Sequence, residues 1–470
     1  IRGIYPDDVN EEVAYRVGRS LVKLFHVERA AIGRDVRLSS PELLKYAIKG
    51  MQDAGADVMD IGMCGTEMIY FAVAHYKLDG GIMITASHLP FHRNGFKFFT
   101  RDGGVEKGDI AEILGMAASG DLPAPKTGGP CVEVDSMSRY KAQLVDYPRS
   151  GVKAADYNRP LAGMHIIVDA GNGSGGFFVD VLEELGARTE GSQFTDPDGH
   201  FPNHIPNPED KKAMASVCGA VVNSRADLGI IFDTDVDRSA IVLRNGEPVN
   251  RNALIALIAA VVLKEHPGST VVTDSVTSDG LADFIRQHGG RHHRFRRGYK
   301  NVIDEGLRLN KRGEECWLAI ETSGHCALRE NFFLDDGAFL VAKLIVEAAR
   351  LRKEGKELDD LIASLRQPEE STEIRFRVDD DHVMEYGQKV LDWLAEHASA
   401  VGGWTVVSPN YEGVRVSCAN DDERGWFLLR KSLHDPVLPL NIESDVKGGV
   451  EMIRQKLFEL LKPFNKLTVM

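Results

Sequence analysis

The chain is poor in the features that mark several protein classes. Its 470 residues include only six cysteines, none of them in a Cys-x-x-Cys pair, so we expect reduced, mostly structural thiols in a reducing compartment. No apolar run approaches the length of a membrane-spanning helix. Positive charge is also in short supply, because Lys and Arg number 56 against 70 Asp and Glu. The resulting net charge of −14 argues against a nucleic-acid partner.

What remains is an ordinary globular composition. Hydrophobic residues make up 43% of the chain, which supports packed cores, and the length favours roughly three or four domains. An anionic small molecule is still an acceptable ligand, since a few local cations can hold it. We expect a cytoplasmic protein, or a plastid stromal one if a transit segment precedes Ile1, acting as a monomer or homodimer.

Strand-like and helix-like segments alternate through most of the chain, which predicts mostly parallel, layered α/β domains. The rhythm includes strands at Leu228–Phe232 and Thr270–Thr273 and a helix at Asp279–Gln287. A helix at Met137–Tyr147 is expected to stop at Pro148, because proline breaks helix interiors. After Pro368 the character changes to an α+β module. The predicted domains are 1–150, 151–247, 248–368 and 369–470, arranged around a central cleft.

One polar segment after an apolar strand carries the strongest chemical signal. Ile82-Met83-Ile84 leads into Thr85-Ala86-Ser87-His88-Leu89-Pro90, and Asn94-Gly95-Phe96-Lys97 follows. The pattern places a serine hydroxyl at a strand end beside a histidine, with a lysine ten residues later. Serine is a weak nucleophile alone and needs charged neighbours, so this setting suits covalent phosphoryl chemistry.

A second apolar strand runs into three alternating carboxylates. Leu228–Phe232 is followed by Asp233, Asp235 and Asp237, with Arg238 directly after them. Three oxygen ligands on one loop suit Mg²⁺, and crowding them without a cation is unfavourable. A strand followed by Asp-x-Asp is also similar to haloacid-dehalogenase-type phosphatases, in which Asp233 would be the nucleophile.

Two further loops have the residue types that bind sugars and phosphates. Glu321-Thr322-Ser323-Gly324-His325 follows a strand, and its Glu and Ser suit vicinal hydroxyls. Near the other end, a strand delivers Arg430 and then Ser432, and an arginine fork with turn amides suits phosphate. Asp435 would repel a phosphate unless its side chain points away.

All four loops resemble, in the same order, those of the α-D-phosphohexomutase superfamily, most closely its phosphomannomutase/phosphoglucomutase branch. The family patterns are Thr-Ala/Gly-Ser-His-Asn-Pro, Asp-Gly-Asp-x-Asp-Arg, Gly-Glu-x-Ser-Gly-His and Arg-x-Ser-x-Thr-x-Pro. Smaller similarities lie at Ile1-Arg2-Gly3 and at Gly298-Tyr299-Lys300, which is like Thr-Gly-x-Lys in relatives. The chain departs from the family's usual residues at Leu89, at Thr234, at Ala319-Ile320 where Gly usually precedes the Glu, and at Leu433, His434 and Asp435.

The resemblance implies a reversible exchange of hexose 1-phosphate and hexose 6-phosphate, of glucose or mannose, through a phosphoserine and a hexose 1,6-bisphosphate. It implies a phosphoserine domain, a metal-binding domain, a sugar-binding domain and a phosphate-binding domain, in chain order. The residue roles that it implies fall into three groups: Ser87, His88, Lys97, Arg2, His325 and Arg238 for catalysis; Ser87, Asp233, Asp235 and Asp237 for Mg²⁺; and Glu321, Ser323, Gly298, Tyr299, Lys300, Arg430 and Ser432 for the substrate.

Two alternatives stay open at this point. A phosphatase using Asp233 would tolerate loss of Ser87. A family member with altered activity would bind sugar phosphates without turnover, or would mainly make the bisphosphate, and Leu89, Leu433 and Asp435 motivate that hypothesis. Gly171-Asn172-Gly173-Ser174-Gly175-Gly176 also fits a dinucleotide motif, but Asp169 would crowd a pyrophosphate, so we interpret it as a tight turn.

Overall fold

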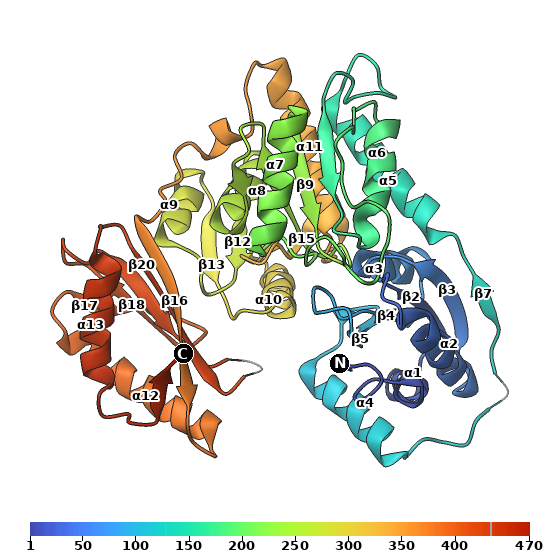
Figure 1. The fold of residues 1–470 in the computed structure, drawn as a ribbon, viewed down its shortest axis with the longest axis horizontal. Coiled ribbons are helices and arrows are strands. Elements are labelled where there is room, and N and C mark those ends of the chain that lie inside the picture. The colour runs from blue at the N-terminus through green and yellow to red at the C-terminus, as the bar shows by residue number, and fades with distance from the viewer. Residues whose placement is uncertain (127, 433–434) are drawn as a thin grey trace. The chain divides into compact units, whose positions relative to one another are not determined.

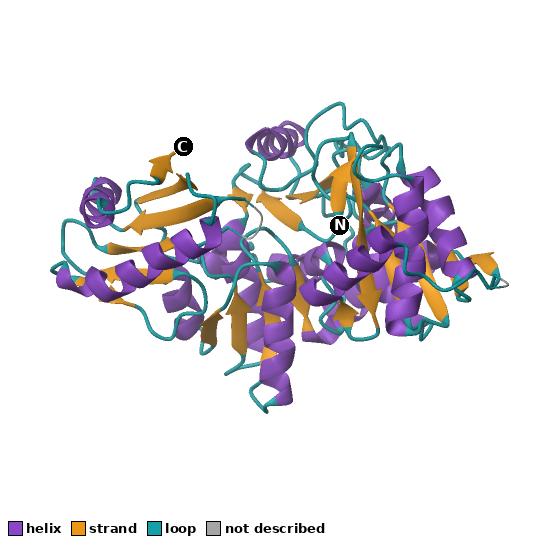
Figure 2. Ribbon diagram, turned by 90° about the horizontal axis from the view of Figure 1, so that it is seen from below, coloured by secondary structure: helices purple, strands orange, loops and turns teal. Residues whose placement is uncertain are grey.

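The computed structural model describes residues 1–126, 128–432 and 435–470. The chain forms two compact units, and each is made of two separate chain segments. The first unit comprises Ile1–Leu254 and Ser323–Asp360, and the second comprises Ile255–Thr322 and Leu361–Met470. Helices flank the strands in both units (Figure 2). The six cysteines are free thiols, as expected, and no helix in the described ranges has the length and apolarity to cross a membrane.

The first unit begins with a mixed sheet in which β2, β3, β4 and β7 pair in parallel and β5 runs antiparallel to β4 and β1. The strand order is β1-β5-β4-β2-β3-β7, with β6 on the edge of β5. The strands are β1 Arg2–Ile4, β2 Arg29–Arg34, β3 Asp57–Met63, β4 Gly80–Ile84, β5 Arg93–Thr100, β6 Gly103–Gly104 and β7 Cys131–Glu133. The helices are α1 Glu11–Phe25, α2 Ser40–Asp53, α3 Thr66–His75 and α4 Lys107–Ser119.

Alternate residues of these strands face different helices, as the two-residue period of a strand requires. Ala30 and Ile32 of β2 belong to the core under α1, α2 and α4. Gly33, one residue on, faces the other side, where an added Cβ would meet Ile69 of α3. Helices α1 and α2 lie side by side in Figure 1. Their close approach depends on Gly50, because a Cβ there would lie 2.1 Å from a backbone oxygen of α1.

A second sheet in the same unit has the order β11-β10-β9-β8. Only β8 and β9 pair in parallel, while β9, β10 and β11 form an antiparallel meander. Helix α7 packs on the face of β8, β9 and β10 through an apolar core. The strands are β8 Ile166–Asp169, β9 Leu228–Phe232, β10 Ser239–Leu243 and β11 Pro248–Val249. The helices are α5 Ser136–Val152, α6 Phe178–Glu184, α7 Lys211–Ser224 and α11 Gly337–Lys353.

The expected break at Pro148 is wrong, because α5 continues through this proline to Val152. Contacts with α11 offset the cost of an interior proline. The ring of Tyr147 packs on Phe339, and Arg350 donates to the carbonyl of Gly151. Lys353 in turn donates to the Val152 carbonyl, so the last turn of α5 keeps hydrogen-bonded carbonyls.

The second unit contains a parallel sheet segment and an antiparallel sheet. In the parallel segment β12 pairs with β13 on one side and β14 on the other. Its strands are β12 Thr270–Thr273, β13 Arg291–Arg294 and β14 Cys316–Ile320, and its helices are α9 Asp279–Gln287 and α10 Tyr299–Lys311. Helix α8, Arg251–Glu265, crosses the unit boundary in the chain, and β15, Cys326–Leu328, lies in the second segment of the first unit.

The remaining module of the second unit is an antiparallel sheet with the order β17-β18-β19-β20-β16-β21. Helices α12 and α13 lie along this sheet in Figure 1 and share an apolar core with it. The strands are β16 Glu370–Val378, β17 Trp404–Val406, β18 Val414–Cys418, β19 Gly425–Leu429, β20 Val437–Ser444 and β21 Leu467–Val469, and the helices are α12 Val383–His397 and α13 Gly449–Leu461. The fold is therefore α/β with a final antiparallel-sheet module, as expected.

Candidate active site

The Ser87 hydroxyl, which follows buried strand β4, lies between the carboxylate of Asp233 and the guanidinium of Arg238. Ser87 is only 2% exposed, and its φ of 52° lies in the left-handed region that non-glycine residues rarely adopt. Its Oγ donates to Asp233 Oδ2 at 3.1 Å and accepts from Arg238 Nη2 at 3.0 Å. Strained backbone at a polar, buried serine is typical of functional sites.

Three of the four predicted metal ligands come together on one hairpin loop. Asp233, Asp235 and Asp237 lie between β9 and β10, and each offers an oxygen within 4.8 Å of the others. Val236 has a φ of 61°, and its N–H donates to the Asp233 carbonyl, so the tight loop turns alternate side chains inward. All three carboxylates are fully buried.

Two cations offset part of this buried negative charge. Lys97 Nζ lies 2.7 Å from Asp235 and 2.5 Å from Asp237, and Arg238 Nη2 lies 2.7 Å from Asp233. Burial raises the pKa of Asp233 to about 8, against the charge of Arg238. Burial also acts on Asp235, but Lys97 and the Thr66 hydroxyl outweigh it and hold the pKa of that carboxyl below its ordinary value.

The loop retains oxygen atoms that suit a divalent cation. Among the described residues, Oδ1 of Asp235 and Oδ1 of Asp237 are buried and have no hydrogen-bond partner. An unpaired buried carboxylate oxygen is unfavourable unless a cation or donor satisfies it. Mg²⁺ prefers such oxygen ligands, so the residues of this loop fit the predicted metal.

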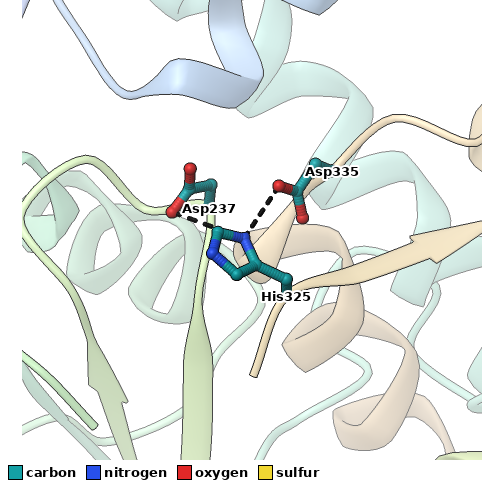
Figure 3. A group of neighbouring side chains, drawn as sticks. All are labelled: Asp237, His325 and Asp335. Carbon is teal, nitrogen blue, oxygen red and sulfur yellow. Dashed lines mark hydrogen bonds and ion pairs between the residues drawn. The ribbon is translucent and has the colours of Figure 1, made fainter. Parts of the chain in front are cut away.

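His325 joins the same cluster from a different part of the chain (Figure 3). Its Nδ1 lies 2.8 Å from Asp335 Oδ2 and 3.8 Å from Asp237 Oδ1. Burial lowers the pKa of His325, but the Asp335 and Asp237 carboxylates outweigh it and raise the pKa to about 9. The imidazole is therefore protonated at neutral pH and adds positive charge beside the acidic loop.

The other two predicted catalytic residues lie near Ser87 in different settings. Burial and the charge of Arg238 lower the pKa of His88 to about 3, so this imidazole is neutral. Its Nδ1 lies 2.6 Å from Arg238 Nη2 and 3.3 Å from Ser87 Oγ. Arg2 is exposed on β1, paired with Gly95, and its charge also contributes to the low pKa of His88.

The predicted sugar-binding residues of the second unit gather around Glu321 at the end of β14. Glu321 Oε1 accepts from the Gly298 N–H at 2.5 Å, and the φ of 116° at Gly298 is one that side chains oppose. Tyr299 begins α10, and Lys300 Nζ pairs with Asp304 at 2.6 Å. Ser323 follows Glu321 in the chain but belongs to the first unit.

The predicted phosphate loop keeps its arginine and serine. Arg430 is 6% exposed, burial lowers its pKa, and its buried Nε has no hydrogen-bond partner among the described residues. Ser432 Oγ accepts from the Asp435 N–H at 3.2 Å, and Asp435 itself is exposed. Leu433 and His434 lie outside the described residues. A buried arginine with an unsatisfied donor suits an anionic ligand.

Two residues that the sequence interpretation missed form hydrogen bonds with these candidate site residues. Asp335 orients His325, but in the sequence it belongs to an Asp-Asp pair that reads as the start of a helix. Arg37 is fully buried and donates to the carbonyls of Ser87, Leu89, Pro90 and Arg93. Because Arg37 binds the main chain at Leu89, the departure from Asn at that position leaves this support intact. The available signal was the polar run Asp35-Val36-Arg37 directly after the buried strand β2.

Comparison with known proteins agrees with this geometry. Three family models match, described as phosphoglucomutase/phosphomannomutase alpha/beta/alpha domains I, II and III, over residues 1–121, 145–246 and 250–368. The chain belongs to the α-D-phosphohexomutase superfamily. The sequence resemblance is therefore confirmed at the level of the family.

Relatives of this superfamily match nearly the whole chain. A phosphoglucomutase of Neisseria gonorrhoeae is 30% identical over 460 residues, covering 97% of this chain and 94% of the relative. A phosphomannomutase of Salmonella typhimurium is 32% identical over 480 residues, covering 99% and 98%. The solved structure of a phosphoglucomutase/phosphomannomutase family protein from Burkholderia thailandensis has a TM-score of 0.84 at 28% identity, covering 98% and 96% of the two chains.

Proposed function

We propose that the protein interconverts hexose 1-phosphate and hexose 6-phosphate by carrying a phosphoryl group on Ser87. The observation that carries the proposal is the Ser87 hydroxyl, bonded to both Asp233 and Arg238 on the acidic loop. Serine becomes a useful phosphoryl carrier when an adjacent acceptor and cations stabilise the charge that develops. The names of the relatives motivate glucose and mannose phosphates as substrates.

Each turnover consists of two phosphoryl transfers. The phosphoryl group leaves Ser87 Oγ for the free hydroxyl of the bound hexose monophosphate. That hydroxyl gives up its proton, Ser87 Oγ takes up a proton, and a hexose 1,6-bisphosphate forms. After the sugar reverses its orientation, the other phosphate returns to Ser87 Oγ, which gives up its proton, and the new sugar hydroxyl takes up a proton. Phosphate is therefore conserved, and a trace of bisphosphate is needed to charge the serine.

The residues around Ser87 are proposed to have different roles in binding Mg²⁺, moving protons and binding the substrate. Asp233, Asp235 and Asp237, with the phosphorylated Ser87, would hold Mg²⁺, which supplies neutralisation of the transferring phosphoryl group. Arg238 orients Ser87 Oγ. Lys97 and protonated His325 are the candidates for moving the sugar proton, and Arg2 adds positive charge. Glu321 and Ser323 would bind sugar hydroxyls, with Gly298, Tyr299 and Lys300 beside them, while Arg430 and Ser432 hold the non-reacting phosphate.

The rival phosphatase hypothesis makes Asp233 the nucleophile. Asp233 Oδ2 already accepts from Ser87 Oγ and from both Nε and Nη2 of Arg238, so its attack would require these bonds to break. The hypothesis of a binding-only family member rests on Leu89, Leu433 and Asp435. Two observations weigh against this hypothesis: the Leu89 carbonyl accepts a hydrogen bond from Arg37, and Asp435 is exposed.

A coupled assay tests the proposal. Glucose 1-phosphate and mannose 1-phosphate are supplied with Mg²⁺ and a trace of glucose 1,6-bisphosphate, and 6-phosphate product and free phosphate are followed together. We expect bisphosphate-dependent isomerisation that Ser87→Ala abolishes and that the exposed Ser119→Ala leaves unchanged. Free phosphate without isomerisation, with tolerance of Ser87→Ala, would instead establish the phosphatase.

A further inference from the structure

Arg297 lies between the two substrate-binding segments of the second unit. It follows β13 and precedes Gly298, whose N–H donates to Glu321. Its own N–H donates to Glu412 Oε2 at 3.1 Å, and the Ser275 hydroxyl donates to the same oxygen. The backbone of Arg297 is thus fixed on one side by the turn at Glu412 and continues on the other into the Glu321 contact.

The turn at Glu412 packs directly against Arg430. Gly413 has a φ of 59°, and a Cβ added there would lie 2.8 Å from both Cα and Cβ of Arg430. Glu412 therefore links the backbone of Arg297 to the backbone of Arg430 through a short run of close contacts. The charges are close enough to interact, because Arg297 contributes to the lowered pKa of Arg430 after burial, while Glu412 opposes it.

The nearby carboxylates are engaged with neighbouring donors. Glu412 accepts from Ser275 and from the Arg297 backbone, and Asp274 Oδ2 accepts from the Thr322 hydroxyl at 2.7 Å. The guanidinium of Arg297 forms a longer ion pair with Asp274, with 3.9 Å between Nε and Oδ2. Meanwhile the buried Nε of Arg430 has no partner among the described residues.

Arg297 and Arg430 are two positive charges that interact, and within the described part of the chain the buried Nε of Arg430 is an unsatisfied donor. An anion bound by both side chains would be favourable. A phosphate dianion has three acceptor oxygens and accepts from two guanidinium forks at once. We propose that Arg297 is a second phosphate-binding residue, which together with Arg430 holds the phosphate of the sugar that is not reacting. This inference rests on the proposed function, since the anion is the hexose phosphate itself.

Arg297 then contributes to substrate affinity in both sugar orientations, because the non-reacting phosphate occupies the same place in each. Its loss should raise KM for hexose phosphates more than it lowers kcat. Inorganic phosphate, used as a competitive probe of the same site, should lose affinity in parallel.

The test compares Arg297→Ala with Arg296→Ala in the bisphosphate-dependent assay. Arg296 is an exposed neighbour whose Nε donates to the Tyr411 carbonyl, so its removal changes net charge equally. We expect Arg297→Ala to raise KM for glucose 1-phosphate and the inhibition constant of inorganic phosphate about 10-fold or more, with kcat within about threefold. Arg296→Ala should stay within about twofold of the wild type on both constants.

A double-mutant cycle with Arg430→Ala separates a shared phosphate from a structural effect. If both arginines bind one phosphate, the KM effect of Arg297→Ala in the Arg430→Ala background is clearly smaller than in the wild type. Arg297→Gln, which removes the charge and keeps bulk, repeats the measurement if Arg297→Ala unfolds. If the wild type is active, unchanged KM values in both Arg297 variants would overturn the inference. Fully additive effects of Arg297→Ala and Arg430→Ala on KM would also overturn it. An inactive wild type would instead count against the proposed function.

Discussion

At the level of single residues, the Ser87 hydroxyl is the group on which the proposed chemistry depends. Its oxygen lies within 3.1 Å of a carboxylate acceptor and a guanidinium donor, and its backbone is in the left-handed region. Around it the protein buries three carboxylates and surrounds them with Lys97, Arg238 and His325. Such a cluster is stable only as a whole, because each buried charge depends on its neighbours.

The pairing of His325 with Asp335 predicts a specific pH dependence of stability. The pKa of His325 is raised from 6.5 to about 9, so the protonated form is stabilised in the folded state. This contribution to the free energy of unfolding is at most about 3 kcal/mol. It is fully present below the ordinary pKa of 6.5 and is lost as the pH rises through the folded-state pKa of about 9. In metal-free protein, the difference in Tm between wild type and Asp335→Asn should therefore shrink between these two pH values.

Asp198→Asn is the matched control, since it removes a carboxylate from the exposed His200–Asp198 pair. Its effect on Tm should be small and nearly independent of pH across the same range. A difference for Asp335→Asn that stays constant with pH would contradict the assigned protonation of His325.

Local sequence patterns point to most of the candidate site residues but not to the residues that hold them in place. Ser87, Asp233, Asp235 and Asp237 each follow an apolar strand, and that position makes a polar residue conspicuous. Asp335 and Arg37 act through contacts with residues far away in the chain, and such contacts have no local period.

At the scale of helices and strands, close backbone packing is the feature that sequence periodicity describes least well. The bounds of β9, β12 and α9 agree with those predicted, because each is a short apolar or capped segment. The strand order β1-β5-β4-β2-β3-β7 depends on crossovers that no local pattern encodes. Helix α5 passes through Pro148 because α11 binds its last carbonyls, which is again a tertiary effect.

The contact between α1 and α2 gives a prediction at this scale. Gly50 is buried in α2, and a Cβ there would lie 2.1 Å from the Tyr15 carbonyl of α1. Gly50→Ala should therefore separate the helices and lower the free energy of unfolding by about 2 kcal/mol, despite the better helix propensity of alanine.

Gly115→Ala provides the control, because this exposed glycine of α4 has nothing within 4 Å of an added Cβ. That variant should be neutral or stabilised by up to about 1 kcal/mol in chemical denaturation. Equal effects of the two substitutions would show that propensity, and not helix packing, governs Gly50.

For the molecule as a whole, the residues proposed to react and most of those proposed to bind the sugar phosphate belong to different compact units. Ser87 and the acidic loop lie in the first unit, while Glu321, Arg297 and Arg430 lie in the second. Each unit is built from two chain segments, so neither is a contiguous piece of sequence. This division predicts that turnover and substrate affinity respond to different substitutions.

Direct binding measurements test that division of labour. Ser87→Ala should abolish turnover and yet bind glucose 6-phosphate within about threefold of the wild-type Kd by calorimetry. Arg430→Ala should weaken binding by about 10-fold or more while Ser87 still accepts a phosphoryl group. Loss of glucose 6-phosphate binding in a folded Ser87→Ala variant would contradict this separation.

Intact-protein and peptide mass spectrometry show directly whether Ser87 carries the phosphoryl group. The protein is incubated with glucose 1,6-bisphosphate and Mg²⁺, and then with excess glucose 6-phosphate. We expect one added phosphoryl group at Ser87 that is discharged to the sugar, and none in Ser87→Ala. A phosphoryl group found on Asp233, or an unmodified Ser87 in protein that isomerises the sugar, would contradict this expectation.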